Sequence, residues 1–278
     1  MDLDHAVGEV ARSHPLDPWA RVAEAVQALE LTDLRPSPTV NVLFGQLVDA
    51  ALALPACHPQ IARHGPRVRH LCARGEGYLE TWWAHRVIAD PETLPSFPYL
   101  TQYEQLVRGE WTALTGALGR RPRHVALVGS GPLPLTAVWW RRLAPDVQVT
   151  CIDRDPGAVG LGRRVAWSVA GRAGAPAFVH AEAGEVDSSA FDAVVLAALV
   201  GDAAGKTAAV DALASRMRDD GVLAVRSVPP DGRRLLYPRV RPEDLPSSVR
   251  LVAEWTPPPE VINSVLLLAP RAAGPDRR

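Results

Sequence analysis

The sequence predicts an α/β protein in which a helical region precedes a mostly parallel β-sheet. Three observations carry this prediction. Apolar residues recur at helical spacing up to about residue 118. From residue 119 onward, short apolar runs alternate with helical stretches, and the last two apolar runs follow each other with only a short loop between them. We therefore expect an all-α domain over residues 1–118 and a sheet domain over residues 119–278.

Three amphipathic stretches indicate helices in the first region. They cover residues 38–54, about 67–88 and 99–118. In the first stretch the apolar residues follow the i, i+3, i+4, i+7 pattern of one buried helix face. Pro38 stands at a favourable first helical position, and Ser37 is the expected N-cap. In the second stretch Gly75 and Gly77 weaken the predicted helix near its middle.

The second region predicts seven strands, most of them separated by helices. The strand segments are HVALVG, VQVTCID, AFVHA, FDAVVLAALV, GVLAVRSV, VRLVAEW and VINSVLLL. The predicted helices are PLTAVWWRRLA, PGAVGLGRRVAWSVAG and residues 206–218. Nearly continuous apolar strands joined by helices are typical of a parallel sheet that is covered on both faces. The short Pro-rich loop before the last strand permits only an antiparallel hairpin. This order is typical of the Rossmann-like, class I S-adenosylmethionine-dependent methyltransferase fold, an analogy that does not fix the reaction.

Composition excludes several classes of protein. The chain has 278 residues, 47% of them hydrophobic, and a formal net charge of −1, which predicts neither a nucleic-acid nor an anionic-membrane partner. Cys57, Cys72 and Cys151 form no Cys-x-x-Cys pair, and the eight histidines form no HExxH motif, so we expect no disulfide scaffold and no bound metal. No apolar run approaches the ~20 residues that span a bilayer, and the first residues resemble no signal peptide. The expected location is the cytoplasm.

A glycine turn follows the first predicted strand. Gly129 and Gly131 flank Ser130 in this turn. Because glycine has no side chain, the backbone can approach a ligand at the start of the next helix. The third glycine of the dinucleotide fingerprint is missing, and Pro132 and Pro134 each remove an amide donor. We therefore do not expect a pyrophosphate site. A ligand without phosphates, or a plain tight turn, remains open.

Two acidic residues favour a nucleoside at this turn. Asp153 ends the next strand, where a carboxylate commonly accepts the ribose hydroxyls. Glu182 follows the third strand and is a candidate for the adenine region. Together with the glycine turn, these residues favour a nucleoside ligand.

The segment VALVGSGPLPLTAV resembles the nicotianamine synthase family. Further similar segments are LRPSPTVNVLFGQLV, RHLCARGEGYLETWWAH, PSFPYLTQYEQLVRGEW, FDAVVLAALVG, AVRSVPPDGRRLLYP and PEVINSVLL. They keep their order over roughly residues 34 to 268, and GSGPLPLT and INSV are the most specific. The resemblance implies an enzyme that binds S-adenosylmethionine as a substrate. It also implies transfer of the 3-amino-3-carboxypropyl group to an amine, with release of 5′-methylthioadenosine.

Such a transfer needs a carboxylate near the reacting amine. An α-amine is mostly protonated at neutral pH, so a nearby group must hold it and accept its proton. Glu80 fits this need, and the resemblance matches it to a family glutamate associated with the amine. Tyr103 matches a family tyrosine near the same centre. Both are expected catalytic residues, which places the active site between the two regions. Glu76, one helical turn before Glu80, is a candidate substrate-binding residue.

The amino-acid end of the substrate needs a cation. Arg226 ends a predicted strand on the side of the ligand crevice, where its guanidinium suits a carboxylate. Arg234 and Tyr237 match a family arginine and tyrosine, and we expect all three to bind substrate. A structural salt bridge remains an equal alternative for either arginine. Three further residues are expected to line the adenosine or substrate pocket through backbone contacts: Leu133, Ala198 and Leu199.

The identity of the acceptor stays open. The segment FPYLTQY departs from the FPYY-x-NY pattern of many family members at Leu100 and Gln102. The expected acceptor is a small-molecule amine or amino acid, used once or repeatedly to build a nicotianamine-like metallophore or its precursor. The alternatives are intramolecular cyclisation of S-adenosylmethionine to azetidine-2-carboxylate, methyl transfer, and nucleoside binding without catalysis. The sequence leaves open whether the chain forms a homo-oligomer.

Overall fold

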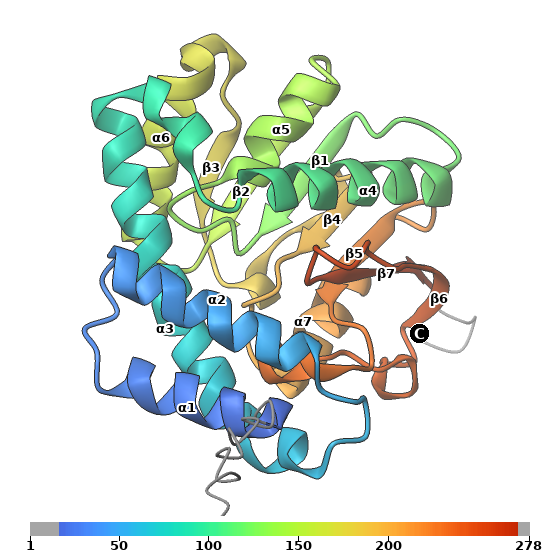
Figure 1. The fold of residues 1–278 in the computed structure, drawn as a ribbon. Helices are drawn as coiled ribbons and strands as arrows, with labels where there is room; N and C mark the ends of the chain where they lie inside the picture. Colours follow the sequence, from blue (N-terminus) through green and yellow to red (C-terminus); the bar gives the residue numbers. More distant parts are fainter. Residues whose placement is uncertain (1–16, 272–278) are drawn as a thin grey trace, which may run out of the picture.

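The computed structural model describes residues 17–271 and begins with a helical region (Figure 1). Its helices are α1 (Pro18–Glu30), α2 (Pro38–Leu52), α3 (Pro59–Ala89) and α4 (Leu100–Leu118), with a 3₁₀ turn at Pro91–Ser96. The three predicted helices are therefore present. The expectation about a signal peptide falls outside the described residues.

The local sequence explains where these helices begin and why one of them is longer than predicted. The Ser37 hydroxyl accepts the backbone N–H of Val40 and caps α2, as predicted. Helix α3 continues through Gly75 and Gly77, the two residues expected to weaken it, and the weakening itself stays a prediction. A Cβ atom at Gly75 would lie 2.2 Å from the ring of Phe44 in α2. The glycine thus permits close contact between α2 and α3 and does not break the helix.

All seven predicted strands form one sheet. They are β1 (His124–Val128), β2 (Gln148–Asp153), β3 (Ala177–His180), β4 (Ala193–Leu196), β5 (Val222–Ser227), β6 (Val249–Trp255) and β7 (Ser264–Pro270). The order is β3-β2-β1-β4-β5-β7-β6. The first five strands are parallel, while β7 is antiparallel to both β5 and β6. The predicted parallel sheet with a closing antiparallel hairpin is confirmed.

Helices cover both faces of this sheet. They are α5 (Leu135–Leu143), α6 (Pro156–Gly174) and α7 (Ala203–Ala214). Side chains alternate along the strands, so Leu127 packs into the core beneath α4, α5 and α6, whereas Ala126 packs into the core beneath α7. The last helix begins earlier than predicted because the Asp202 carboxylate accepts the N–H of Gly205.

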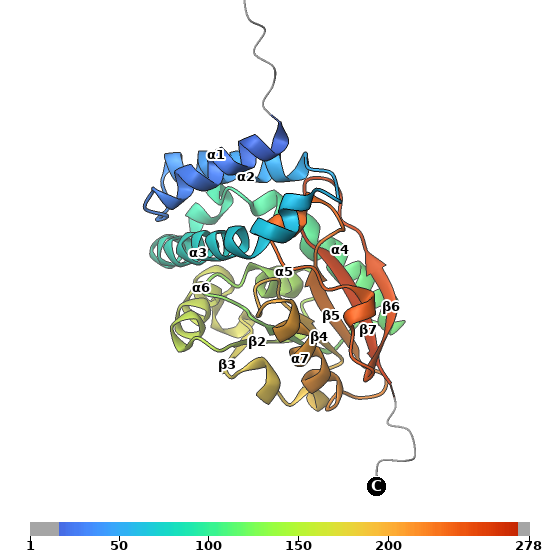
Figure 2. The same cartoon turned by 90° about the horizontal axis from the view of Figure 1, so that it is seen from below.

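The helical region continues into the sheet through a shared core. One hydrophobic cluster contains Trp83 from α3, Leu106 from α4 and Leu127 from β1. A separate cluster joins α1, α2 and α3, and Figure 2 shows α1 and α2 on the side of α3 away from the sheet. Helix α4 packs directly on α5 and on strands β6 and β7. The predicted division into two domains at residue 118 therefore stays a prediction. None of the helices among residues 17–271 combines the length and apolarity that a membrane crossing requires.

Candidate active site

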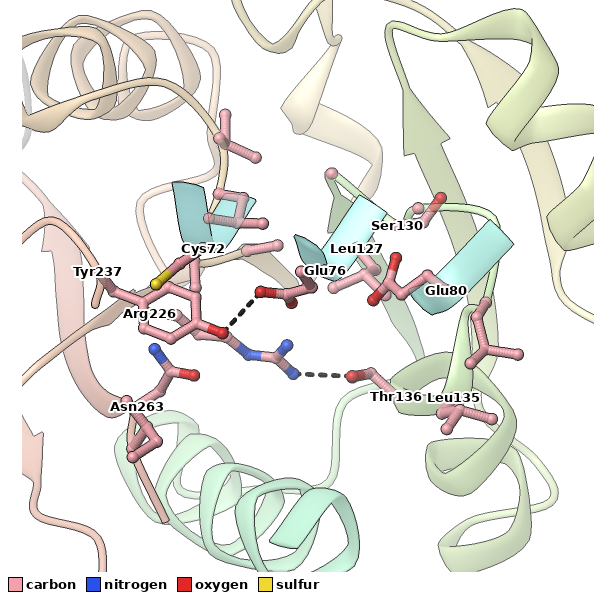
Figure 3. A pocket seen from close by; sticks show the side chains of 18 of the residues that line it. Cys72, Glu76, Glu80, Leu127, Ser130, Leu135, Thr136, Arg226, Tyr237 and Asn263 are labelled. Carbon is pink, nitrogen blue, oxygen red and sulfur yellow. Dashed lines mark hydrogen bonds between the residues drawn. The ribbon is translucent and has the colours of Figure 1, made fainter. Parts of the chain in front are cut away.

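A cavity of about 870 Å³ lies at the carboxyl ends of the central parallel strands, against α2, α3 and α4 (Figure 3). This is the edge where open parallel sheets bind ligands. Thirteen of the fourteen residues predicted for the site line it. They are Glu76, Glu80, Tyr103, Gly129, Ser130, Gly131, Leu133, Asp153, Glu182, Ala198, Leu199, Arg226 and Tyr237.

The glycine turn forms one wall of the cavity. Gly129 and Gly131 have φ values of 79° and 66°, in the left-handed region that favours glycine. The N–H of Gly131 donates to the Asp153 carboxylate at 2.8 Å. A Cβ atom on Gly131 would lie 2.6 Å from a carboxylate oxygen of Glu80. Glycine is thus required both by the turn and by the close approach of Glu80.

Asp153 connects this turn to the next one. Its second oxygen accepts the N–H of Asp155 at 3.0 Å, so each carboxylate oxygen has one backbone donor. A carboxylate has about four acceptor positions, which leaves room for ribose hydroxyls. Glu182 is exposed at the start of a short 3₁₀ turn on the same side of the cavity. Their roles in nucleoside binding stay predictions.

Glu80 and Tyr103 meet across the helical region. The Tyr103 hydroxyl of α4 donates to the Glu80 carboxylate of α3 at 3.2 Å. Burial raises the pKa of Glu80 well above its usual value, and the neighbouring Glu76 and Asp153 carboxylates add to the effect. Burial likewise raises the pKa of Tyr103, so its hydroxyl stays a proton donor in the hydrogen bond.

Glu76, one helical turn before Glu80 in α3, also accepts a hydrogen bond from a tyrosine. The Tyr237 hydroxyl donates to the Glu76 carboxylate at 2.6 Å, and Figure 3 shows both beside Arg226. Burial raises the pKa of Glu76, while the Tyr237 hydrogen bond and the charge of Arg226 oppose this rise. Among the described residues, neither Glu76 nor Glu80 forms a salt bridge.

Arg226 lines the cavity and is also held by a salt bridge. Its Nε and Nη2 donate to the two oxygens of the buried Glu110 at 2.8 and 3.0 Å, and Nη2 also donates to Thr136 at 2.9 Å. Its Nη1 forms no hydrogen bond with the described part of the chain. Lys206, completely buried, donates from Nζ to the Arg226 backbone carbonyl at 2.7 Å. Burial, followed by the charge of Arg226, lowers the pKa of Lys206 to about 7.

The structure does not bring Arg234 to the cavity. Residues Gly232–Leu235 form a 3₁₀ turn that sends Tyr237 into the site, whereas the Arg234 guanidinium donates to the Ala56 carbonyl at 3.3 Å. Its own carbonyl accepts a hydrogen bond from Arg69. Arg234 is therefore removed from the proposed substrate-binding residues.

Several cavity features were not predicted. Glu110, Thr136 and Lys206 position Arg226, and Glu110 could have been found because it is an acidic residue on the apolar face of α4. Helix α2 and the segment before it contribute an apolar wall formed by Leu34, Pro36, Val40, Phe44 and Val48. Between residues 17 and 271, no three His, Cys, Asp or Glu side chains are grouped so that they could hold a metal ion.

Solved structures with the same fold include a nicotianamine synthase and a methyltransferase. The structure of MtNAS in complex with MTA and tNA has a TM-score of 0.79 and 19% identity, covering 93% of this chain and 100% of MtNAS. The mitomycin 7-O-methyltransferase MmcR has a TM-score of 0.52 and 15% identity, covering 89% of this chain and 76% of that protein. These similarities confirm the predicted fold class.

Sequence comparisons show the family. A model of the family described as nicotianamine synthase protein matches residues 20–273. Nicotianamine synthase 1 of Oryza sativa subsp. indica is 36% identical over 264 residues, covering 86% of this chain and 76% of the relative. Nicotianamine synthase 1 of Hordeum vulgare is 35% identical over 253 residues, with the same coverage. The chain therefore belongs to the nicotianamine synthase family of S-adenosylmethionine-dependent aminocarboxypropyl transferases.

Proposed function

We propose that the cavity binds S-adenosylmethionine and that Glu80 deprotonates the amine of a separate amino-acid acceptor, which receives the 3-amino-3-carboxypropyl group. The observation that carries this proposal is the position of Glu80, hydrogen-bonded by Tyr103 and lying directly over Gly131. A buried carboxylate of raised pKa is suited to accept a proton from an ammonium group.

The cavity matches the charge of the donor. S-adenosylmethionine carries a sulfonium cation, and the carboxylates of Glu76, Glu80 and Asp153 all line the same space. Asp153 would accept the ribose hydroxyls, while Glu182, Ala198 and Leu199 would lie around the adenine. The sulfonium would then lie near the glycine turn, within reach of the acceptor amine held by Glu80.

The proposed reaction is an in-line displacement at the donor's γ-carbon. The nitrogen lone pair forms a bond to this carbon, the carbon–sulfur bond breaks, and its electron pair returns to sulfur as the neutral thioether 5′-methylthioadenosine. Glu80 takes the proton that leaves the nitrogen. The protein contributes mainly orientation and proton acceptance, because the sulfonium is already an activated leaving group.

Cavity size favours an intermolecular reaction over ring closure. At about 870 Å³ it lies in the upper part of the ~300–1,000 Å³ range of sites for drug-sized ligands. Helix α2 adds an apolar wall to the cavity, and we expect the acceptor to lie on that side. Gln102, one of the two residues that depart from the family pattern, also lines the cavity, whereas Leu100 does not. A nicotianamine-like metallophore or its precursor is the proposed product.

Product analysis tests this function. Purified protein is incubated with S-adenosylmethionine, alone and with each candidate amino acid, and the products are identified by mass spectrometry. We expect 5′-methylthioadenosine together with an acceptor that has gained an aminobutyryl unit. Formation of S-adenosylhomocysteine would instead identify a methyltransferase. Adenosyl binding without any product would support the noncatalytic alternative.

A further inference from the structure

Helix α3 presents two carboxylates to the cavity, and the proposed reaction uses only one as a base. Glu80 and Glu76 lie one turn apart on the same helix face, and each accepts a hydrogen bond from a different tyrosine. Glu80 lies against the glycine turn, whereas Glu76 lies beside Tyr237 and Arg226 (Figure 3). Their different surroundings imply different roles.

Glu76 and Arg226 together form a receptor for an amino-acid zwitterion. Arg226 holds Glu110 and Thr136 through Nε and Nη2, which leaves Nη1 available for a substrate carboxylate. Glu76 has a hydroxyl donor but no cation bonded to it, so it can accept hydrogen bonds from an ammonium group. A carboxylate and an ammonium on one α-carbon match these two partners.

We propose that Glu76, oriented by Tyr237, holds the α-ammonium of the S-adenosylmethionine donor in its protonated form and so prevents the donor from closing on itself. This inference rests on the function proposed above. If that amine lost its proton, its lone pair could bond to the donor's own γ-carbon. The carbon–sulfur bond would break, its electron pair would return to sulfur, and azetidine-2-carboxylate and 5′-methylthioadenosine would form. The ion pair with Glu76 keeps the lone pair bound to a proton.

The environments of the two glutamates agree with this division of roles. Burial and two neighbouring carboxylates give Glu80 the stronger upward shift in pKa, as suits a base. The pKa of Glu76 is also raised by burial, but Tyr237 and Arg226 stabilise its ionised form. Pairs of titratable groups whose surroundings separate their pKa values commonly divide proton-transfer and charge-holding roles.

The test is the ratio of the two products that share one donor. Wild type, Glu76→Gln and Tyr237→Phe are assayed at saturating acceptor, and azetidine-2-carboxylate and the aminobutyryl adduct are quantified by mass spectrometry. We expect Glu76→Gln to raise the azetidine-to-adduct ratio roughly ten-fold or more, the factor that corresponds to one charge-assisted hydrogen bond. Tyr237→Phe should raise it less, because the charge of Glu76 remains. Tyr99→Phe is the matched control, since Tyr99 lines the cavity without bonding either glutamate.

The outcomes separate this inference from the proposed function. Absence of 5′-methylthioadenosine from wild type contradicts the proposed function. A wild type that forms the adduct, combined with an unchanged product ratio in both variants, overturns the inference alone. A wild type that forms 5′-methylthioadenosine and mainly azetidine-2-carboxylate contradicts both the proposed function and the inference. Thermal unfolding is measured for each variant, and Tyr237→Phe, which retains the buried carboxylate, provides the ratio if Glu76→Gln does not fold.

Discussion

Two groups of buried charged side chains meet at this cavity. In one group the protein supplies the opposite charge, and in the other it supplies only neutral hydrogen-bond donors. Below the cavity, Arg226 engages both oxygens of Glu110 and also Thr136. In its wall, and within residues 17–271, the carboxylates of Glu76 and Glu80 accept hydrogen bonds only from tyrosine hydroxyls. Burying a charge is costly unless it is paired and hydrogen-bonded. The first group therefore holds itself together within the scaffold, and we expect a cationic substrate to complete the second.

The direction of the pKa shifts reflects this difference. Burial by itself would lower the pKa of Arg226, but the charge and hydrogen bonds of Glu110 outweigh it and the net shift is upward. For Glu80, burial acts in the same direction as the neighbouring carboxylates, and the Tyr103 hydrogen bond opposes them without prevailing. The pairing with Glu110 thus favours the charged form of Arg226, whereas the surroundings of Glu80 favour its protonated form.

Removing the base should give the largest effect. Glu80→Gln keeps the shape of the side chain but cannot accept the proton, so we expect kcat to fall by about 10²–10⁴-fold. Binding of S-adenosylmethionine, measured by calorimetry, should change only a few-fold. Glu254→Gln, at an exposed position that does not line the cavity, serves as the control for loss of a carboxylate. Turnover near the wild-type rate in Glu80→Gln would show that another group is the base.

Breaking the completed pair should affect stability. Arg226→Met leaves the Glu110 carboxylate buried without its cation, and we expect a loss of about 3–5 kcal/mol in the free energy of unfolding. The double variant Arg226→Met/Glu110→Leu should recover much of this loss, because no unpaired charge remains. Urea unfolding measures both. Strictly additive losses would show that the two residues do not act as a pair.

Displacing the Glu80 carboxylate by a substitution at Gly131 should weaken substrate binding by a more moderate factor. Gly131→Ala forces a left-handed backbone on alanine, which costs about 1–2 kcal/mol, and places a methyl group 2.6 Å from the Glu80 carboxylate. We expect the dissociation constant for S-adenosylmethionine to rise about ten-fold or more, with a fall in kcat. Gly116→Ala, where a Cβ would meet open space, is the matched control. Unchanged binding and turnover in Gly131→Ala would remove this turn from the site.

Lys206 is buried and donates to a neutral carbonyl, and its substitution should change mainly how stability depends on pH. Its pKa is lowered from 10.5 to about 7 in the folded protein. Between these values the unfolded chain binds a proton that the folded chain lacks, so the free energy of unfolding rises with pH by up to ~1.4 kcal/mol per unit. Below the lower value this dependence disappears. Lys206→Met should lose it between pH 7 and 9, as measured by urea unfolding, and an identical pH dependence would show that Lys206 stays charged.

Local sequence patterns were sufficient for most of the architecture. The nearly continuous apolar runs HVALVG and VQVTCID depend only on nearby residues and on burial of both sheet faces, so they predict strands. The short loop between VRLVAEW and VINSVLLL excluded a parallel crossover, and β7 is indeed antiparallel to β6. Local propensity gave no reason for Gly75 in this helix, because the reason is close contact with Phe44 on another helix.

The sequence by itself determined the order of elements, the glycine turn and most of the residues that line the cavity, since each depends on spacing within one segment or on a family motif. Only the tertiary structure decided which charges are paired. Glu110 and Arg226 are far apart in the chain, and nothing local shows that one neutralises the other. The tertiary structure likewise brings Tyr237 to Glu76 and directs Arg234 to the Ala56 carbonyl. Electrostatic pairing depends on distances in space and on burial, which the fold sets. Helices and strands depend mainly on the periodicity of apolar residues along the chain.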